Sequence, residues 1–238
     1  MQLLNQSISR LVRDTRGLVM RYYRSAALLV SLAALSVIIP AAQAHPPAGA
    51  GATKVAPFKS GGGVSAQEVA VASFTPSYTG EPVPACRLLG KGKVLFAQAE
   101  STCTVKPGVK VLVPLPGASC SDAEPPPFFG KSAAEQRACA LAIIRQEVLE
   151  LTVSVDGRPP QNVLRDRFLT ISDQFDVVSQ PGNPFGATPG PTTLVAVGYL
   201  GVLRGLPPGH HMFVVSGFAF GAPFTSTWTV NVVPGAHH

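Results

Sequence analysis

The chain of 238 residues is long enough for one domain of ordinary size with additional terminal segments. It is 46% hydrophobic and 13% charged, and its formal net charge is +6. Five arginines and one aspartate lie in residues 1–44, so the rest of the chain holds 14 basic and 12 acidic residues and carries only +2. This remainder contains no basic run, which argues against a nucleic-acid-binding protein.

Residues 1–44 have the pattern of a secretory signal peptide. Arginines precede an uninterrupted apolar stretch at residues 26–39, and Ala42 and Ala44 follow at the positions that a signal peptidase recognises. The stretch has 14 residues, whereas a membrane-spanning helix needs about 20. We predict cleavage after Ala44, a secreted or periplasmic protein, and no membrane span after signal cleavage. Met20 opens a shorter leader of the same type and is an alternative start.

Pro, Gly and Ala dominate residues 45–65, which contain few side chains able to form a core. We predict a flexible spacer in this segment. A β-sandwich domain is expected at residues 66–234, followed by a disordered C-terminus at residues 235–238.

The four cysteines, Cys86, Cys103, Cys120 and Cys139, are 17, 17 and 19 residues apart. This spacing lacks the close pairs of a zinc site, so we expect no bound metal and no other cofactor. In an exported chain an even number of cysteines indicates disulfide bonds, and four cysteines allow three pairings. We favour the sequential pairing, in which Cys86 bonds Cys103, Cys120 bonds Cys139, and each bond closes a short loop.

Most segments after residue 90 alternate apolar and polar side chains and end at Gly or Pro, as strands with one buried face do. In the last of them, residues 224–233, Trp228 and Val230 fall on one face and Thr227 and Thr229 on the other. The other predicted strands are residues 93–98, 109–115, 151–155, 167–171, 192–203 and 211–218. This pattern predicts a mainly β fold, an antiparallel β-sandwich of jelly-roll type with one inserted α-helix.

The inserted helix is predicted in "SAAEQRACALAIIRQEVLE", residues 132–150. Ser132 and Glu135 have the three-residue spacing of a capping box, which satisfies the first free amide groups of a helix. Apolar side chains recur at helical spacing at Ala138, Leu141, Ile144 and Val148. Cys139 lies in the second turn, so a bond to Cys120 would tie the helix to the preceding strand.

Four segments resemble those of a group of exported bacterial β-sandwich proteins of unassigned function. "TGEPVPACRLLGKGKVLF" is similar to that group's T-G-x-x-C motif, and "CTVKPGVKVLVPL" to its C-x-V-P-x-G-K strand entry. "LTVSVDGRPPQNV" resembles its V-D-G-x-P segment, and "LPPGHHMFVVSG" its L-P-P-G-x-H segment, with His211 at the histidine position. The group's Trp-containing N-terminal segment is missing, and its D-G-Y triplet is here Val197-Gly198-Tyr199. The resemblance covers most of residues 79–233; it implies a β-sandwich and the favoured disulfide pairing, and it brings no catalytic residues.

Two adjacent histidines, His210 and His211, begin the strand at residues 211–218. Successive side chains of a strand point to opposite faces, so the two imidazoles cannot readily bind one metal ion. A zinc site also needs three or four converging ligands. We therefore predict a structural role for His211, partly buried and hydrogen-bonded to the backbone or to a neighbouring strand.

Paired carboxylates are the remaining candidates for catalysis, because two of them placed across a sugar bond can hydrolyse it. Glu147 and Glu150 lie three residues apart at the predicted helix end, and Asp173 and Asp176 lie in "SDQFDVV". The second pair lacks the D-x-D-x-D spacing typical of a calcium loop. No G-x-S-x-G nucleophile motif or glycine-rich phosphate loop occurs. We assign no catalytic residue from the sequence.

Two Pro-rich loops carry the candidate ligand-binding residues. "EPPPFFGK" (residues 124–131) contains Phe128 and Phe129, and "QPGNPFGATPGP" (residues 180–191) contains Phe185. Aromatic side chains on rigid loops can stack on sugars or contact a partner protein. The interpretation that we favour from the sequence is that these phenylalanines cap the ends of the sandwich.

The leading hypothesis is a non-catalytic binding or structural protein at the cell surface or in the periplasm, with a glycan or a cell-surface protein as its partner. The alternative is an extracellular polysaccharide-active enzyme whose carboxylates come together only in the fold. Two carboxylates facing each other across a cleft would favour the enzyme, and exposed phenylalanines on a shallow surface would favour binding.

Overall fold

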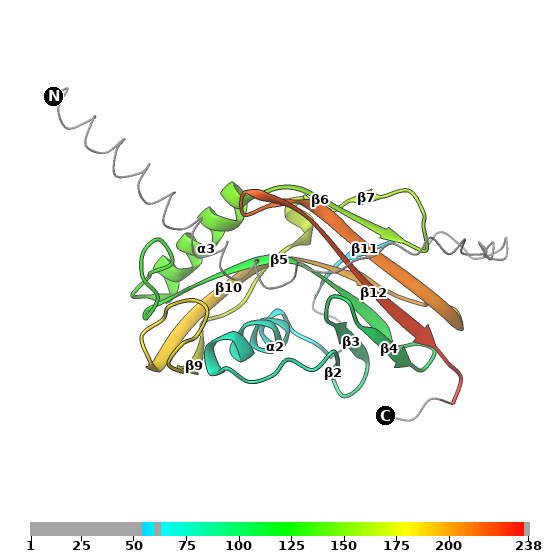
Figure 1. Cartoon of the computed structure of the whole chain (residues 1–238), viewed down its shortest axis with the longest axis horizontal. Helices are drawn as coiled ribbons and strands as arrows, with labels where there is room; N and C mark the ends of the chain where they lie inside the picture. Colours follow the sequence, from blue (N-terminus) through cyan, green and yellow to red (C-terminus); the bar gives the residue numbers. More distant parts are fainter. Residues whose placement is uncertain (1–53, 60–62, 236–238) are drawn as a thin grey trace, which may run out of the picture. The chain divides into compact units, whose positions relative to one another are not determined.

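A computed structural model describes residues 54–59 and 63–235, so the predicted signal peptide lies outside the described part of the chain. Within the described part, the chain is mainly β, with two sheets and two α-helices (Figure 1). The seven-stranded sheet contains β1 (Ala56–Pro57), β2 (Cys86–Leu89), β3 (Val94–Ala97), β5 (Lys110–Ser121), β8 (Leu169–Ile171), β9 (Phe175–Ser179) and β10 (Gly190–Leu203). The five-stranded sheet contains β4 (Thr102–Val105), β6 (Val148–Val155), β7 (Gln161–Asn162), β11 (Gly209–Ala219) and β12 (Ala222–Val232). The helices are α2 (Ala66–Thr79), α3 (Ala133–Glu147) and the short 3₁₀ helix η1 (Asp166–Phe168), and none of the described helices is long and apolar enough to cross a membrane.

The long strand β10 organises the seven-stranded sheet. One edge of β10 pairs with β5 in antiparallel register, from Leu194 opposite Ser121 to Leu203 opposite Val111. Its other edge pairs in turn with the short strands β9, β8 and β1. The antiparallel register places the C-terminal end of β5 beside the N-terminal end of β10.

Two strand pairs depart from the expected all-antiparallel order. β3 pairs with β5 in parallel, and β12 pairs with β4 in parallel. The reason for the first is that β4, which lies between β3 and β5 in the sequence, belongs to the other sheet. The chain therefore crosses to the five-stranded sheet and returns before β5 begins, which lets β5 run in the direction of β3. The jelly-roll order remains a prediction of the sequence.

The inner faces of the two sheets share one hydrophobic core. Val113 of β5 and Val197 of β10 belong to the same buried cluster as Phe213 of β11 and Trp228 of β12. The rings of Phe213 and Trp228 stack with centroids 5.2 Å apart. The alternation predicted for the last strand is confirmed, because Trp228, Val230 and Val232 are buried, whereas Thr229 and Asn231 between them are not.

The predicted inserted helix is confirmed as α3. Its N-cap Ser132 accepts a hydrogen bond from the Glu135 N–H, and the Glu135 carboxylate accepts one from the Ser132 N–H, which completes the capping box. The helix ends at Glu147, three residues before the expected end, because Val148 begins β6.

A second helix, α2, was not predicted. Figure 1 shows α2 and α3 on opposite sides of β5 and β10. Val and Ala alternate in "AQEVAVASFTPSYT", so the apolar residues show no clear helical spacing. Pro76, a residue that disfavours helix, also lies inside α2. The caps were readable, because Ser65 accepts a hydrogen bond from the Glu68 N–H and Gly80 ends the helix at a positive φ of 70°.

The segment expected to be a flexible spacer contributes β1 to the sheet. Ala56 and Pro57 pair with Val202 and Gly201 of β10, and Val55 is buried. The Gln161 side-chain amide donates to the Val55 carbonyl at 2.7 Å and accepts from the Val55 N–H at 3.2 Å. These contacts order residues that composition alone assigned to a spacer.

Both favoured disulfide bonds are present. Cys86–Cys103 joins β2 of the seven-stranded sheet to β4 of the five-stranded sheet, and Cys120–Cys139 joins β5 to α3. Two such bonds indicate an oxidising compartment.

Replacing either cysteine pair by alanine should lower the free energy of unfolding by about 3 kcal/mol, because the unfolded chain regains the freedom of a closed loop of this size. Urea unfolding of C86A/C103A and C120A/C139A measures the loss. A reductant should destabilise the wild-type protein and leave a variant without any cysteine unchanged. Equal stability of wild-type and double variants would contradict the expected contribution.

Candidate functional site

The two Pro-rich loops lie side by side. The first, the β5–α3 loop (residues 122–132), leaves the C-terminal end of β5, and the second, the β9–β10 loop (residues 180–189), enters the N-terminal end of β10. The Thr188 N–H donates to the Ala123 carbonyl at 2.9 Å, which joins the loops directly. A Cβ atom on Gly186 would lie 3.9 Å from the Pro125 ring. Pairing of β5 with β10 therefore brings together two loops that are far apart in the sequence.

We call the exposed proline and phenylalanine residues of these loops the two-loop surface. It consists of Pro125, Pro126, Pro127, Phe129, Pro181, Pro184 and Pro189.

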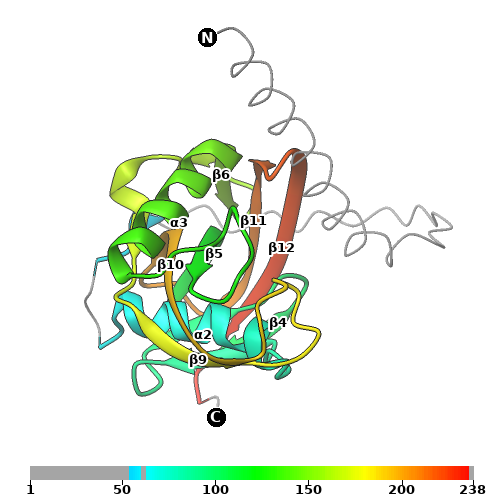
Figure 2. The same ribbon diagram turned by 90° about the vertical axis from the view of Figure 1, so that its left-hand side faces the viewer.

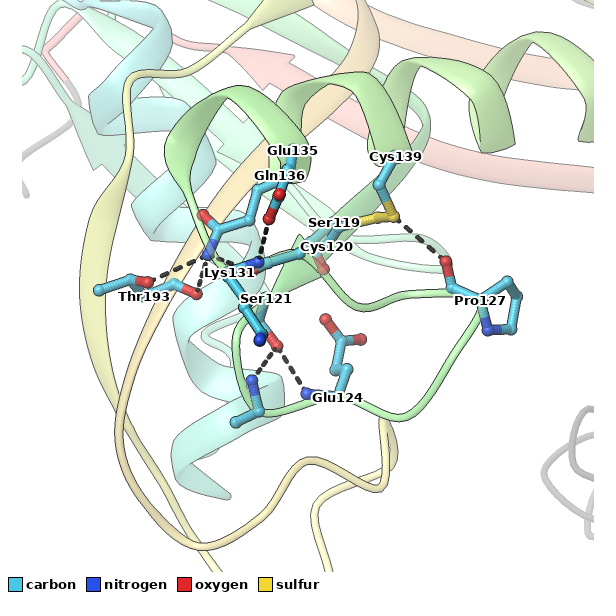
Figure 3. Close-up of a disulfide and its surroundings, with 12 residues drawn as sticks. Ser119, Cys120, Ser121, Glu124, Pro127, Lys131, Glu135, Gln136, Cys139 and Thr193 are labelled. Carbon is cyan, nitrogen blue, oxygen red and sulfur yellow. Dashed lines mark hydrogen bonds between the residues drawn. A yellow bond between two sulfur atoms is a disulfide. The ribbon is translucent and has the colours of Figure 1, made fainter.

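The β5–α3 loop folds back onto the end of β5 (Figure 3). The Ser121 hydroxyl accepts hydrogen bonds from the N–H groups of Ala123 and Glu124, at 3.3 and 3.0 Å. The Ser121 N–H donates to the Phe128 carbonyl, and the Ser121 carbonyl accepts from the Gly130 N–H. Nearby, the Sγ atom of Cys139 lies 3.2 Å from the Pro127 carbonyl oxygen. One serine and one disulfide thus fix the path of the loop.

A single side chain organises the β9–β10 loop. The Asn183 amide oxygen accepts from the N–H groups of Phe185 and Ala187. Its amide nitrogen lies within hydrogen-bond distance of the Ser179 hydroxyl and of the carbonyls of Gln180 and Ala187. The Asn183 side chain therefore forms its hydrogen bonds within the loop and with the end of β9, and these bonds hold the Pro-rich tip in one conformation.

A buried polar pair lies beneath both loops. The Tyr78 hydroxyl of α2 donates to Oε2 of Glu124 in the β5–α3 loop at 2.8 Å and lies 3.2 Å from the Ser119 hydroxyl. The Phe185 ring of the β9–β10 loop packs on the Tyr78 ring, with centroids 4.8 Å apart. A helix and two loops therefore meet at one tyrosine.

Burial dominates the electrostatics of this pair. The Glu124 side chain is only 3% exposed, and this burial raises its pKa to about 7, although the hydrogen bonds from Tyr78 and Ser121 oppose the shift. Burial, followed by the neighbouring Glu124 charge, raises the pKa of Tyr78. Tyr78 is therefore a neutral hydrogen-bond donor, and Glu124 changes its protonation near neutral pH.

A second buried side chain, Gln136, joins α3 to the loop and to β10 (Figure 3). Its amide nitrogen lies 3.0 Å from the Gly130 carbonyl and 3.1 Å from the Thr193 carbonyl. Its amide oxygen accepts from the Gln174 side chain at 3.0 Å. A Cβ atom on Gly130 would lie 2.7 Å from the backbone nitrogen of Gln136, so only glycine lets the loop approach the start of α3 this closely.

The three predicted ligand-binding residues have different surroundings. Phe128 packs against the main core, and Phe185 packs on Tyr78 beneath the loops. Phe129 is 40% exposed and lies on the two-loop surface. Sequence reasoning brought neither Tyr78 nor Glu124 forward as a candidate; the one available signal was a glutamate at the start of an otherwise apolar Pro-rich stretch.

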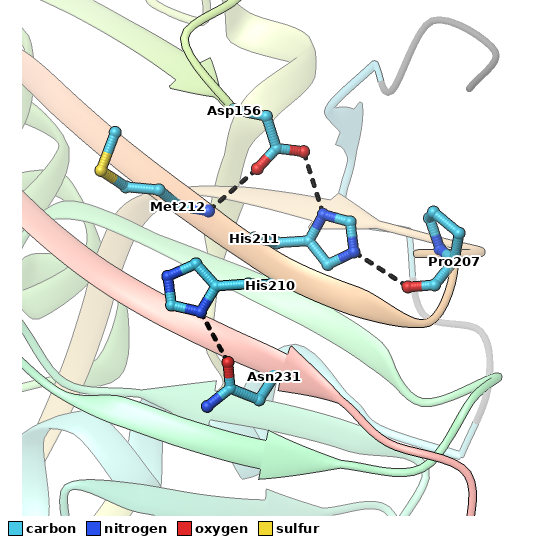
Figure 4. Close-up of polar contacts among 6 residues, drawn as sticks. All are labelled: Asp156, Pro207, His210, His211, Met212 and Asn231. Carbon is cyan, nitrogen blue, oxygen red and sulfur yellow. Dashed lines mark hydrogen bonds and ion pairs between the residues drawn. The ribbon is translucent and has the colours of Figure 1, made fainter. Parts of the chain in front are cut away.

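The two histidines point to opposite faces of β11, as predicted (Figure 4). His211 is buried; its Nδ1 lies 2.9 Å from Oδ2 of Asp156, and its Nε2 lies 2.9 Å from the Pro207 carbonyl. The other carboxylate oxygen of Asp156 accepts from the Met212 N–H. His210 instead contacts Asn231 on the outer face at 2.7 Å. His211 therefore holds the turn after β6 against the start of β11.

The carboxylates singled out in the sequence do not form a recognisable site. Glu150, Asp173 and Asp176 are exposed, and Glu147 is half-buried at the end of α3. Throughout residues 54–59 and 63–235, no group of three or more His, Cys, Asp or Glu side chains could hold a metal ion.

No protein-family model matches the chain, and no curated protein matches it. Among solved structures, the chain is similar to the solution structure of amebosin at 15% sequence identity. The match covers 57% of this chain and 90% of that chain, with a TM-score of 0.21. Similarity at this level carries no argument about fold or function.

Replacing Glu124 by glutamine should change how stability depends on pH. The folded chain holds the Glu124 proton up to about pH 7, whereas the ordinary pKa is 4.5, so the carboxyl stabilises the fold most at low pH. Its contribution falls by about 3 kcal/mol as the pH rises from 4.5 to 7. Chemical unfolding across this range should therefore show that the free energy of unfolding of E124Q, relative to that of the wild-type protein, rises by that amount. The exposed E81Q control should follow the wild type, and parallel curves for E124Q and wild type would refute the assignment.

Proposed function

We propose that the protein is a non-catalytic exported binding protein that contacts a protein partner at the cell surface or in the periplasm through the two-loop surface. The observation that carries this proposal is the hydrogen bond from the Thr188 N–H to the Ala123 carbonyl. It ties two long loops into one unit whose outer side presents proline rings and Phe129. A surface that is already ordered loses little conformational entropy on binding.

The chemistry of the two-loop surface favours an apolar protein segment over a glycan. Glycans need several converging polar groups, whereas Ser121 and Asn183 use theirs within the loops. Among the exposed polar side chains of the loops, Asp122 accepts hydrogen bonds from Thr193, and Ser132 caps α3. Exposed polar side chains are also present at Lys131, Gln180 and Thr188, beside six prolines and Phe129. The apolar rings contribute through burial of apolar area. The β-sandwich of the proposal is supported by the core that the two sheets share, and its export by the two disulfide bonds and the predicted signal peptide.

One observation favours the alternative, a polysaccharide-active enzyme. A carboxyl group with a pKa of about 7 has the property that a general acid needs. Glu124 is nevertheless buried beneath the loop and accepts its hydrogen bond from Tyr78. Because a general acid has to reach its substrate, we favour binding. E124Q separates the two functions, since it would abolish hydrolysis by Glu124 and preserve partner binding.

Truncation of the exposed phenylalanine should weaken partner binding. Labelled mature protein is expected to bind saturably to intact cells of the organism that encodes it, and F129A should bind about tenfold more weakly. The matched control is L149A, because Leu149 is an exposed apolar residue, 58% accessible, outside both loops. Protease treatment of the cells should remove the part of the binding that F129A weakens. Equal binding by F129A and the wild type to untreated cells, or a difference between them that survives protease treatment, would rule out the proposed protein partner.

A further inference from the structure

The outer face of the five-stranded sheet carries an ordered group of threonines. Thr225, Thr227 and Thr229 occupy successive outward positions of β12. On the adjacent strand β4, Thr102 lies opposite Thr229, and Thr104 lies opposite Asn231. Outward side chains are about 7 Å apart along a strand and about 5 Å apart across neighbouring strands. We call these five threonines the threonine face.

The hydroxyl groups of the threonine face are available to a ligand. Other outward polar side chains of this sheet contact each other: Thr152 lies 3.2 Å from the Ser216 hydroxyl, and His210 contacts Asn231. The five threonine hydroxyls have no hydrogen-bond partner within the part of the chain that the structure describes. Neither described α-helix is among the elements packed on β12 or β4, since α2 contacts β8, β9 and β10, and α3 contacts β5, β6 and β10. In Figure 2 both helices lie to the left of β11 and β12.

The strands that form the threonine face carry no charged side chain. None of the positions of β4, β11 and β12 holds Asp, Glu, Lys or Arg. Charged residues border these strands: Glu100 accepts from the Thr227 N–H and Asp156 from the Met212 N–H, while Glu150 of β6 and Lys106 after β4 are exposed. Because carboxylates outnumber the lysine at this border, the face offers no electrostatic attraction to nucleic acids or to acidic polymers, and a neutral ligand matches it better.

Apolar groups lie beside the hydroxyls. Met212 of β11, 43% exposed, stands opposite Thr229, and Val214 stands opposite Thr227. Each threonine adds a methyl group of its own. A neutral sugar chain has the complementary character, because its rings have apolar C–H faces and hydroxyl-bearing edges. The three threonines of β12 span ~14 Å, which gives an extended chain repeated contacts of one kind.

We propose that the threonine face binds a neutral polysaccharide chain. This site is separate from the two-loop surface and goes beyond the proposed protein partner. The hydroxyls of Thr225, Thr227 and Thr229 would exchange hydrogen bonds with the sugar hydroxyls, while Met212 and Val214 would cover part of the C–H faces.

Affinity gel electrophoresis of the mature protein tests the proposal. The gels contain one neutral polymer (mixed-linkage β-glucan, xylan, glucomannan or starch) or one acidic polymer (alginate or polygalacturonate). At least one neutral polymer should retard the wild-type protein, and the acidic polymers should not. Replacing Thr225, Thr227 and Thr229 by valine keeps the strand shape and removes three hydroxyls, so the affinity should fall about tenfold or more.

Two controls make the outcome specific. T170V changes a threonine of β8 in the other sheet and should bind as the wild type does; F129A, which tests the two-loop surface, should also leave polysaccharide binding unchanged. Should the triple variant unfold, threonine methyl NMR of the wild-type protein replaces it, with shifts expected at Thr225, Thr227 and Thr229 and not at Thr170. The proposal is overturned if no neutral polymer binds, if acidic polymers bind equally well, or if the hydroxyls prove dispensable. A concentration-dependent dimer abolished by the triple variant would also overturn it, by assigning this face to a second copy of the chain.

Discussion

The antiparallel pairing of β5 with β10 is the constraint on which the rest of the structure depends. It places the inner faces of both strands in the shared core and gives α2 and α3 opposite sides of one sheet to cover. It also sets Ser121 opposite Leu194, so that the loop leaving β5 and the loop entering β10 start from neighbouring positions. The candidate site is therefore a consequence of strand register, because a shift in that register would separate the loops.

The polar side chains beneath the loops order the loop backbone, and one of them, Glu124, destabilises the fold at neutral pH. Asn183, Ser121 and Gln136 each satisfy several backbone groups, which removes the freedom expected of long Pro-rich loops. Glu124 has the opposite effect at neutral pH, because its charged form is buried. A carboxyl group retained at such a position despite its cost is the kind of feature that functional sites often show. Here it ties the loop to α2 through Tyr78.

How much of the fold was predictable depended on whether the determining signal was local. The capping box of α3, the alternation in β12 and the cysteine spacing are local, and each was interpreted correctly. The strand β1 was not predicted, because the segment is held in place by Gln161, more than a hundred residues away in the sequence. The parallel pairs and the meeting of Tyr78 with Glu124 depend on which strands become neighbours, which periodicity cannot specify. Phe129 was identified as a candidate, but its separation from the buried Phe128 and Phe185 required the packing of both loops.

The two proposed surfaces differ in the chemistry of their exposed side chains. The loops present proline rings and one phenylalanine, whereas the outer faces of β4 and β12 present threonine hydroxyls. The two proposals therefore assign a protein and a neutral polymer to different faces of the chain. The central claim is that the two loops form a single ordered unit before any partner binds. Amide hydrogen exchange of the isolated mature protein tests it most directly at Thr188, whose N–H donates to Ala123. We expect protection comparable to that of the β5 and β10 amides, whereas exchange at the rate of an unstructured peptide would contradict the account.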